Sequence, residues 1–188
     1  MKKLILKILI TGFIVLFFTA KNVYSEYVAS GSSAQLVKLS DEYYTNNLNY
    51  KIKEIAIRNI LERYHSPLLG EEKNFIDSCR RYELDCFLLP SIAGLESTFG
   101  RFIWPNSYNP FGWGGGYIMF DSWKQSIDIV AKGLRENYLN KGAKTIEQIG
   151  PIYSESPTWA TRVNWFKRQF EKEQEKINLL FTDFPVKL

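Results

Sequence analysis

Apolar residues recur every three or four positions along most of the chain after Leu48, and this restricts the fold to packed helices. The first stripe contains Ile52, Ile55, Ala56, Ile60, Leu61 and Tyr64, and it ends just before Pro67. Similar stripes predict helices over 71–82, about 85–99, about 122–138, 145–150 and from about 157 onward. No internal repeat is present, so we expect one mostly α domain.

Polar motifs mark where several of these helices begin and end. Capping boxes, in which Ser or Thr is followed three residues later by Gln, occur at Ser122–Gln125 and Thr145–Gln148. Asp85 is a good N-cap for the third helix, and Gly100 is a natural stop for it. Gly150-Pro151 predicts the end of the short fifth helix.

Residues 101–120 interrupt the helical pattern. The segment is rich in glycine and aromatic residues, and it predicts either a small β-hairpin or an aromatic loop inserted after the third helix. Its aromatic residues are Trp104, Tyr108, Phe111, Trp113, Tyr117 and Phe120. Such a loop suits a glycan groove, because sugars stack on aromatic faces, but it also suits a small core under the segment. We expect Phe111 and Phe120 to be structural and Tyr108 and Trp113 to face a ligand.

Residues 1–25 have the three-part pattern of a secretory signal peptide. Basic Met1–Lys7 is followed by a mostly apolar stretch over 8–20 and by Val23-Tyr24-Ser25 as a cleavage site. The alternative is an uncleaved membrane anchor, for which the stretch is short. In both cases the working part is exported, to the periplasm, the cell wall or the medium. We interpret 26–46 as a polar spacer and 47–188 as the folded domain.

Charge and composition exclude several classes of protein. The net charge is +4, but four lysines and no acid precede residue 26, so the remainder carries equal numbers of basic and acidic side chains. A nucleic-acid binder needs a basic surface, so nucleic acid is not an expected partner. One histidine and two cysteines make zinc fingers and histidine-based metal sites implausible. We expect no metal and no cofactor.

Glu96 is the first candidate for chemistry. It lies near the C-terminal end of the third helix, where the helix dipole and apolar neighbours both raise the pKa of a carboxyl. A carboxyl that stays protonated near neutral pH can serve as the general acid of glycoside cleavage. The alternative is an ordinary exposed helical glutamate.

Cys79 and Cys86 are the two cysteines. On one unbroken helix they would be about 10.5 Å apart along the axis, too far for a disulfide. A break over 82–85 would let the chain turn back and bring them together. A disulfide and two buried thiols therefore both remain open.

Four motifs occur in an order that resembles the glucosaminidase domain of bacterial peptidoglycan hydrolases. They are the segments Gly94–Gly100, Asn109–Gly112, Phe120–Trp123 and Ile152–Ala160. Tyr82–Asp85 is also similar to the related lytic transglycosylases. The resemblance covers about residues 75–170.

The resemblance implies a lysozyme-like fold that acts on peptidoglycan glycan strands, and we expect a monomer. It implies that Glu96 is the general acid and Tyr153 the tyrosine near the cleaved sugar. Tyr108, Asn109, Trp113 and Tyr117 are the expected substrate-binding residues.

Two departures from the family pattern affect the mechanism. Ser156 replaces the usual acid of an Asp-Pro pair, and no acid occurs between Glu96 and Asp121. Asp121 and Glu155 are candidates for a second carboxylate, although Asp121 can equally cap the following helix. The sequence leaves open an N-acetylglucosaminidase-like hydrolase, a lytic transglycosylase and a non-catalytic glycan-binding module.

Overall fold

The structure is a computed structural model that describes residues 35, 37–40 and 42–183. The chain forms two compact units, and the boundary between them follows Leu48. The predicted signal peptide, 1–25, lies outside the described residues. In the first unit, residues 37–40 and 42–48 are helical, whereas the sequence analysis predicted a spacer over 26–46. No Gly or Pro occurs between residues 32 and 67, so the chain contains no helix breaker there.

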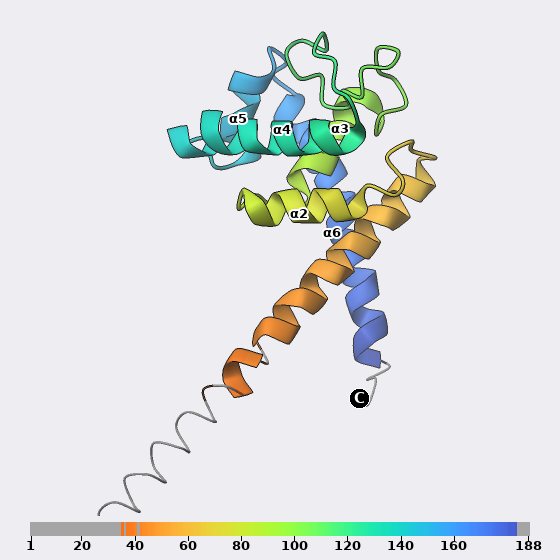
Figure 1. Cartoon of the computed structure of the whole chain (residues 1–188), viewed down its shortest axis with the longest axis vertical. Coiled ribbons are helices and arrows are strands. Elements are labelled where there is room, and N and C mark those ends of the chain that lie inside the picture. Colours follow the sequence, from red (N-terminus) through yellow and green to blue (C-terminus); the bar gives the residue numbers. More distant parts are fainter. Residues whose placement is uncertain (1–34, 36, 41, 184–188) are drawn as a thin grey trace, which may run out of the picture. The chain divides into compact units, whose positions relative to one another are not determined.

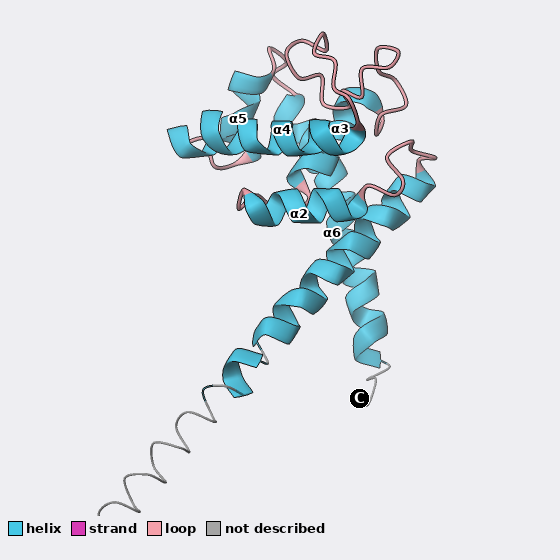
Figure 2. Ribbon diagram, viewed as in Figure 1, coloured by secondary structure: helices cyan, strands magenta, loops and turns pink. Residues whose placement is uncertain are grey.

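The second unit is built from helices, as predicted (Figures 1 and 2). Residues 49–63 are helical, and the helices that follow are α2 (Glu72–Arg81), α3 (Leu88–Ser97), α4 (Trp123–Asn137), α5 (Ile146–Tyr153) and α6 (Trp159–Asp183), with a short 3₁₀ helix, Leu139–Lys141, after α4. The described residues contain no β-strand. Of the two alternatives for 101–120, the structure therefore has the loop and not the hairpin. The loop lies at one end of the unit (Figure 2).

Helix α3 is shorter than predicted at both ends. It begins at Leu88, because Asp85 caps the preceding turn: its Oδ1 accepts a hydrogen bond from the Phe87 N–H at 2.9 Å. It ends at Ser97, because Thr98, Phe99 and Gly100 all have positive φ. The left-handed turn at 98–100 directs the chain away from the helix and into the loop.

Helix α5 begins as predicted and ends later. The Thr145–Gln148 capping box is formed in full. The helix then passes through Gly150-Pro151 and ends at Tyr153. Proline only removes one N–H donor, and the next turn still closes through the Ser154 N–H bonded to the Gly150 carbonyl at 2.9 Å. This extra turn belongs to the site, because it carries Tyr153.

The buried helix α3 packs against α6, and α2 packs against α4. Gly94 allows the first contact, since a Cβ there would lie 2.7 Å from Phe166 Cδ1. Phe99 and Phe170 are fully buried beside this contact, and each contributes about 1.5–3 kcal/mol of hydrophobic stabilisation. The buried end of α3 thus gives the site a rigid base.

Cys79 and Cys86 form a disulfide, with their Cα atoms 4.9 Å apart. Helix α2 ends at Arg81, and the turn at 82–85 brings the chain back. The bridge joins the last turns of α2 to the segment that leads into α3.

Candidate active site

Ser97 fixes the end of α3 to the loop. Its hydroxyl is buried and donates to the Pro110 carbonyl at 2.7 Å, while the Gly100 N–H donates to the same oxygen at 2.7 Å. One small polar side chain thus joins the helix, the left-handed turn and the loop. Glu96, its neighbour in the last turn of α3, is therefore held in a defined place next to the loop.

Asn109, predicted as a substrate-binding residue, is buried and organises the loop through its side-chain amide. It is 4% exposed. Its amide nitrogen donates to the Trp113 and Ile118 carbonyls at 2.9 and 3.1 Å, and its Oδ1 accepts from the Trp113 N–H at 3.0 Å. A short amide that can both donate and accept is well suited to closing such a loop.

Gly112 brings the loop backbone next to the Glu96 carboxyl. A Cβ at this position would lie 3.2 Å from Glu96 Oε2, and Gly112 has a φ of +62°. Both the close approach and the backbone conformation favour glycine. The motif Asn109–Gly112 therefore shapes the surroundings of the carboxyl by its backbone.

Trp159 holds the other carboxyl oxygen. Its indole Nε1–H donates to Glu96 Oε1 at 2.7 Å, and its side chain is 2% exposed at the start of α6. Trp159 is a core residue. Its contact with Glu96 could not be predicted from the sequence, because the direction of an indole N–H depends on how α6 crosses α3.

The pKa of Glu96 is raised. Partial burial of the carboxyl beneath Trp159 and Gly112 is the main cause, and the Trp159 hydrogen bond and the positive charge of Arg162 oppose it. The side chain as a whole remains exposed, so a substrate can reach it. Within the described residues, no acidic side chain is among the groups that shift this pKa. Arg162, one turn after Trp159, was not anticipated from the sequence.

Tyr153 lies beside Glu96 with its hydroxyl already engaged. The O–H donates to the Phe111 carbonyl at 2.7 Å, and the ring stacks on Trp159 with centroids 4.8 Å apart. Burial, Glu96 and Tyr138 together raise the pKa of Tyr153 well above its usual range. The tyrosine therefore stays neutral and ties the loop to α5, and only its lone pairs remain for a substrate.

Four aromatic side chains form a wall next to the carboxyl: Trp113, Tyr138, Tyr153 and Trp159. Tyr153 and Trp113 have ring centroids 5.8 Å apart, and Tyr153 and Tyr138 6.1 Å. A small cavity of about 80 Å³ is lined by Tyr138, Tyr153 and the backbone of the turn that contains Gly112. Tyr138 was not singled out from the sequence as a site residue.

The other predicted binding residues differ in their exposure. Tyr108 is half-buried, with its ring edge-on to Trp123 at 5.0 Å, and Trp113 packs so closely on Gly133 that a Cβ there would lie 2.5 Å from the indole. Tyr117 is 88% exposed. Of the three, Tyr117 thus presents the most open ring, and Trp113 is anchored on α4 at the edge of the aromatic wall.

The two candidates for a second carboxylate do not contact Glu96. Ser122 caps α4, and Asp121 before it is paired with the Gln125 side chain: its Oδ2 accepts from Gln125 Nε2 at 2.8 Å and its N–H donates to Gln125 Oε1 at 2.6 Å. Glu155 is exposed and lines a separate hollow between Pro151 and Pro157. The structure brings Glu96 and Tyr153 together, but neither acid joins them. Phe111 and Phe120 are buried, as predicted.

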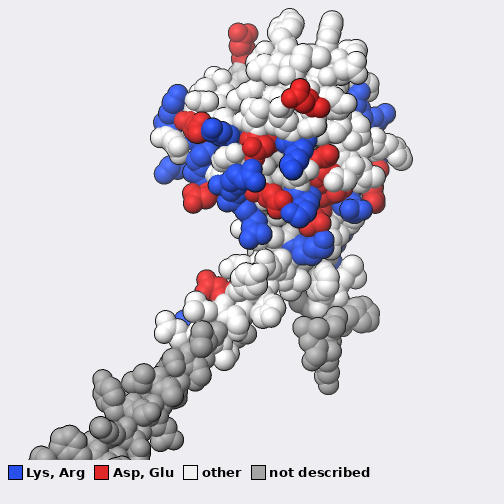
Figure 3. Space-filling view, in the orientation of Figure 1, with Lys and Arg blue, Asp and Glu red and all other residues white. Residues whose placement is uncertain are grey.

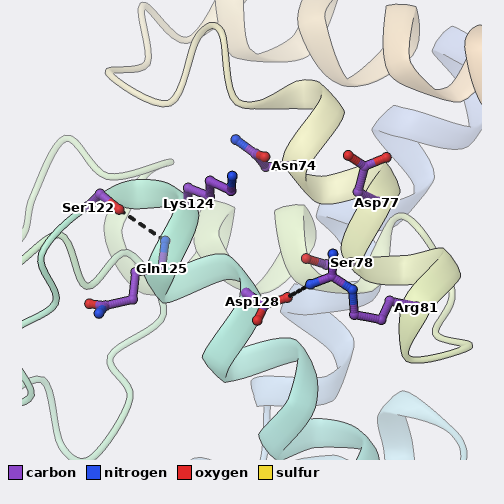
Figure 4. Close-up of a pocket in the computed structure, with 8 residues that line it drawn as sticks. All are labelled: Asn74, Asp77, Ser78, Arg81, Ser122, Lys124, Gln125 and Asp128. Atoms are coloured by element: carbon purple, nitrogen blue, oxygen red, sulfur yellow. Dashed lines mark hydrogen bonds and ion pairs between the residues drawn. The ribbon is translucent and has the colours of Figure 1, made fainter.

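A larger polar cavity of about 440 Å³ lies between α2 and α4 (Figure 4). Arg81 and Asp128 pair across it at 2.5 Å, and the capping residues Ser122 and Gln125 form one edge. Its lining includes neither Glu96 nor any residue of the aromatic wall. The 440 Å³ cavity is therefore separate from Glu96, whereas the small cavity at the glycine turn shares Gly112 with the surroundings of the Glu96 carboxyl.

Charge is distributed unevenly over the second unit. In Figure 3 acidic and basic side chains are mixed over the helices, while the loop end above them is largely uncharged. Between 101 and 120 the only charged residue is Arg101, whereas Phe102 and Trp104 are each 71% exposed. This surface is suited to a neutral ligand that packs on rings.

Within the described part of the chain, no group of three or more His, Cys, Asp or Glu side chains is arranged to hold a metal ion. The helices in that same part are all too short or too polar to cross a bilayer. Comparison of the sequence with known protein families and with curated proteins gives no match.

Proposed function

We propose that this protein is a peptidoglycan glycosidase that cleaves β-1,4 bonds between amino sugars, with Glu96 as its general acid. The observation that carries the proposal is the carboxyl itself. Glu96 stands at the end of a buried helix, has a raised pKa, and is flanked by aromatic rings while remaining reachable from solvent. A carboxyl with a raised pKa, partly shielded from water beside aromatic rings, is suited to protonating a glycosidic oxygen. A lysozyme-like fold is part of the same proposal.

In the first step the protonated Glu96 donates its proton to the glycosidic oxygen. The bond between C1 and that oxygen breaks, and its electron pair stays on the leaving oxygen. The sugar carbon is left electron-poor and must receive an electron pair. Glu96, now a carboxylate, is restored by the proton of the water that completes hydrolysis, or of the sugar hydroxyl in a transglycosylase.

The electron pair for C1 is proposed to come from the substrate. The proposal uses a single carboxyl because Asp121 is paired with Gln125 and Glu155 lines a separate hollow. The oxygen of the sugar's own 2-acetamido group can attack C1, and water then opens the ring that forms. In a lytic transglycosylase a hydroxyl of the sugar attacks instead and leaves an anhydro end.

The loop end is proposed to hold the neighbouring sugars. Its exposed rings, Trp104 and Tyr117, and its nearly uncharged surface suit a neutral glycan (Figure 3). The same proposal places the protein outside the cytoplasmic membrane as a monomer at the cell wall, exported by residues 1–25 or anchored by them.

Product analysis of digested cell walls tests this proposal. The purified full chain is incubated with sacculi, and the released fragments are identified by mass. Reducing N-acetylglucosamine ends are the expected result, and anhydro-muramic ends would show a lytic transglycosylase. Binding to sacculi without any release would favour the non-catalytic module and overturn the enzyme.

A further inference from the structure

The two oxygens of the Glu96 carboxyl have different surroundings. Oε1 accepts the Trp159 indole N–H at 2.7 Å. Oε2 lies on the other side, 3.2 Å from where a Cβ of Gly112 would be. A carboxyl in free rotation would have equivalent oxygens, so this asymmetry is imposed by the fold.

We infer that Trp159 is a positioning residue that reserves Oε1 as an acceptor, so that the acidic proton of Glu96 is carried and delivered by Oε2. The inference rests on the proposed function only in naming the glycosidic oxygen as the proton's destination. The assignment of roles to the two oxygens follows from the contacts around the carboxyl.

The chemistry of the donor fixes the assignment. An indole N–H can only donate, and in a neutral carboxyl the C=O oxygen is a better acceptor than the O–H oxygen. The Trp159 contact at Oε1 therefore favours the form of the neutral acid that carries its proton on Oε2. When Glu96 is ionised, the same N–H stabilises the carboxylate and holds its plane in place for the return of the proton.

The donor itself is immobile. Trp159 is 2% exposed and stacks on Tyr153, whose hydroxyl is bonded to the Phe111 carbonyl. The indole therefore lies between the core and a ring that is itself tied to the loop. It cannot turn away from Glu96 without breaking these contacts.

Gly112 adds no side-chain atoms next to Oε2. The loop backbone passes close to this oxygen, so an added Cβ would lie 3.2 Å from it. Because the Glu96 side chain remains exposed, we place the scissile bond on the solvent side of Oε2, at the edge of the glycine turn.

The indole resonance of Trp159 tests the assignment without any assay of activity. In ¹⁵N-labelled full chain, this N–H signal is identified by its loss in Trp159→Phe. We expect its shift to follow the titration of Glu96 in the wild type and to lose that pH dependence in Glu96→Gln. A Trp159 signal that is indifferent to pH, or that titrates equally in Glu96→Gln, would overturn the inference whatever the activity.

Kinetics of Trp159→Phe provide the second measurement. Loss of the hydrogen bond should lower kcat roughly 10- to 100-fold with KM little changed. It should also shift the basic limb of the pH–rate curve to higher pH, because this hydrogen bond lowers the pKa of Glu96. Trp165→Phe is the matched control, because Trp165 is 52% exposed on the same helix. A folded Trp159→Phe protein with wild-type kcat and pH profile would contradict the inference.

If the wild type cleaves no glycan while the Trp159 signal still follows Glu96, the proposed function fails and the assignment of the two oxygens holds.

Discussion

Gly112 is the residue at which backbone conformation and the chemistry of Glu96 meet. In Gly112→Ala the new Cβ would lie 3.2 Å from Glu96 Oε2, at a φ of +62° that L-residues rarely adopt. We expect a loss of stability of about 1 kcal/mol and a large fall in kcat, measured by denaturant unfolding and by glycan release.

Gly116→Ala is the control for this change. Gly116 also has a positive φ, +83°, but nothing lies within 4 Å of its added Cβ. It should show a similar loss of stability with nearly unchanged kcat. Equal losses of kcat in both variants would remove the special role of Gly112.

The raised pKa of Glu96 has consequences for the pH dependence of both activity and stability. Activity needs the protonated acid, so its basic limb should fall at a pH above the value of about 4.3 that is usual for glutamate. The folded state binds the Glu96 proton more tightly than the unfolded state does. Protonated Glu96 therefore stabilises the folded state in full below its unfolded pKa, and this stabilisation is lost as pH rises through its folded pKa. Because other groups such as Glu173 also titrate, the test is the difference in unfolding free energy between wild type and Glu96→Gln. This difference should change as pH rises through the folded pKa of Glu96, and a difference that is independent of pH would refute the raised pKa.

At the scale of elements, Glu173 joins α6 to the helix over 49–63. It accepts from Asn59 Nδ2 at 3.0 Å and from Arg63 at 2.9 Å. Burial acts to raise the pKa of Glu173, but these hydrogen bonds outweigh it and the pKa is lowered. Its stabilisation is therefore present above the unfolded pKa and is lost as pH falls through the folded one.

Glu173→Gln should lower the free energy of unfolding by about 1–3 kcal/mol at neutral pH, because two charge-assisted hydrogen bonds are weakened. Exposed Glu175→Gln on the same helix should change it by less than about 0.5 kcal/mol. Urea unfolding at neutral pH measures both. Indistinguishable midpoints for the two variants would show that Glu173 does not join the helices energetically.

The disulfide between Cys79 and Cys86 lies at the entry to α3, and we expect it to support this entry without taking part in the chemistry. Closing so short a loop is worth about 2.5 kcal/mol in the chain-entropy account. Reduction should therefore lower the Tm but leave glycan release intact at low temperature. Loss of activity on reduction, in protein that circular dichroism shows to be folded, would be the contrary result.

How far the elements could be predicted depends on how local their signals are. The capping box at Thr145–Gln148 is a contact within one turn, and the structure forms it as expected. Asp85 shows the limit, because the same side chain that can cap a helix here caps the turn before it. The approach of Trp159 and Gly112 to Glu96 depends on tertiary packing, for which the sequence carries no local signal.

For the molecule as a whole, the proposal combines an export signal, a helical domain and one largely uncharged loop end. Examples of polar clusters elsewhere are the ion pair of Arg81 with Asp128 and the helix cap of Ser122 with Gln125. The catalytic claim therefore depends on one carboxyl, and the other acids proposed from the sequence provide its controls.

The most direct test of Glu96 as the general acid is glycan release from sacculi by Glu96→Gln. It is measured beside wild type, Asp121→Asn and Glu155→Gln. Glutamine keeps the shape of the side chain and can still accept from Trp159, but it has no proton to donate at a useful pKa. We predict a folded protein with activity reduced about a thousandfold, while the other two variants keep activity within about tenfold of wild type. Near-wild-type release by Glu96→Gln would contradict the account.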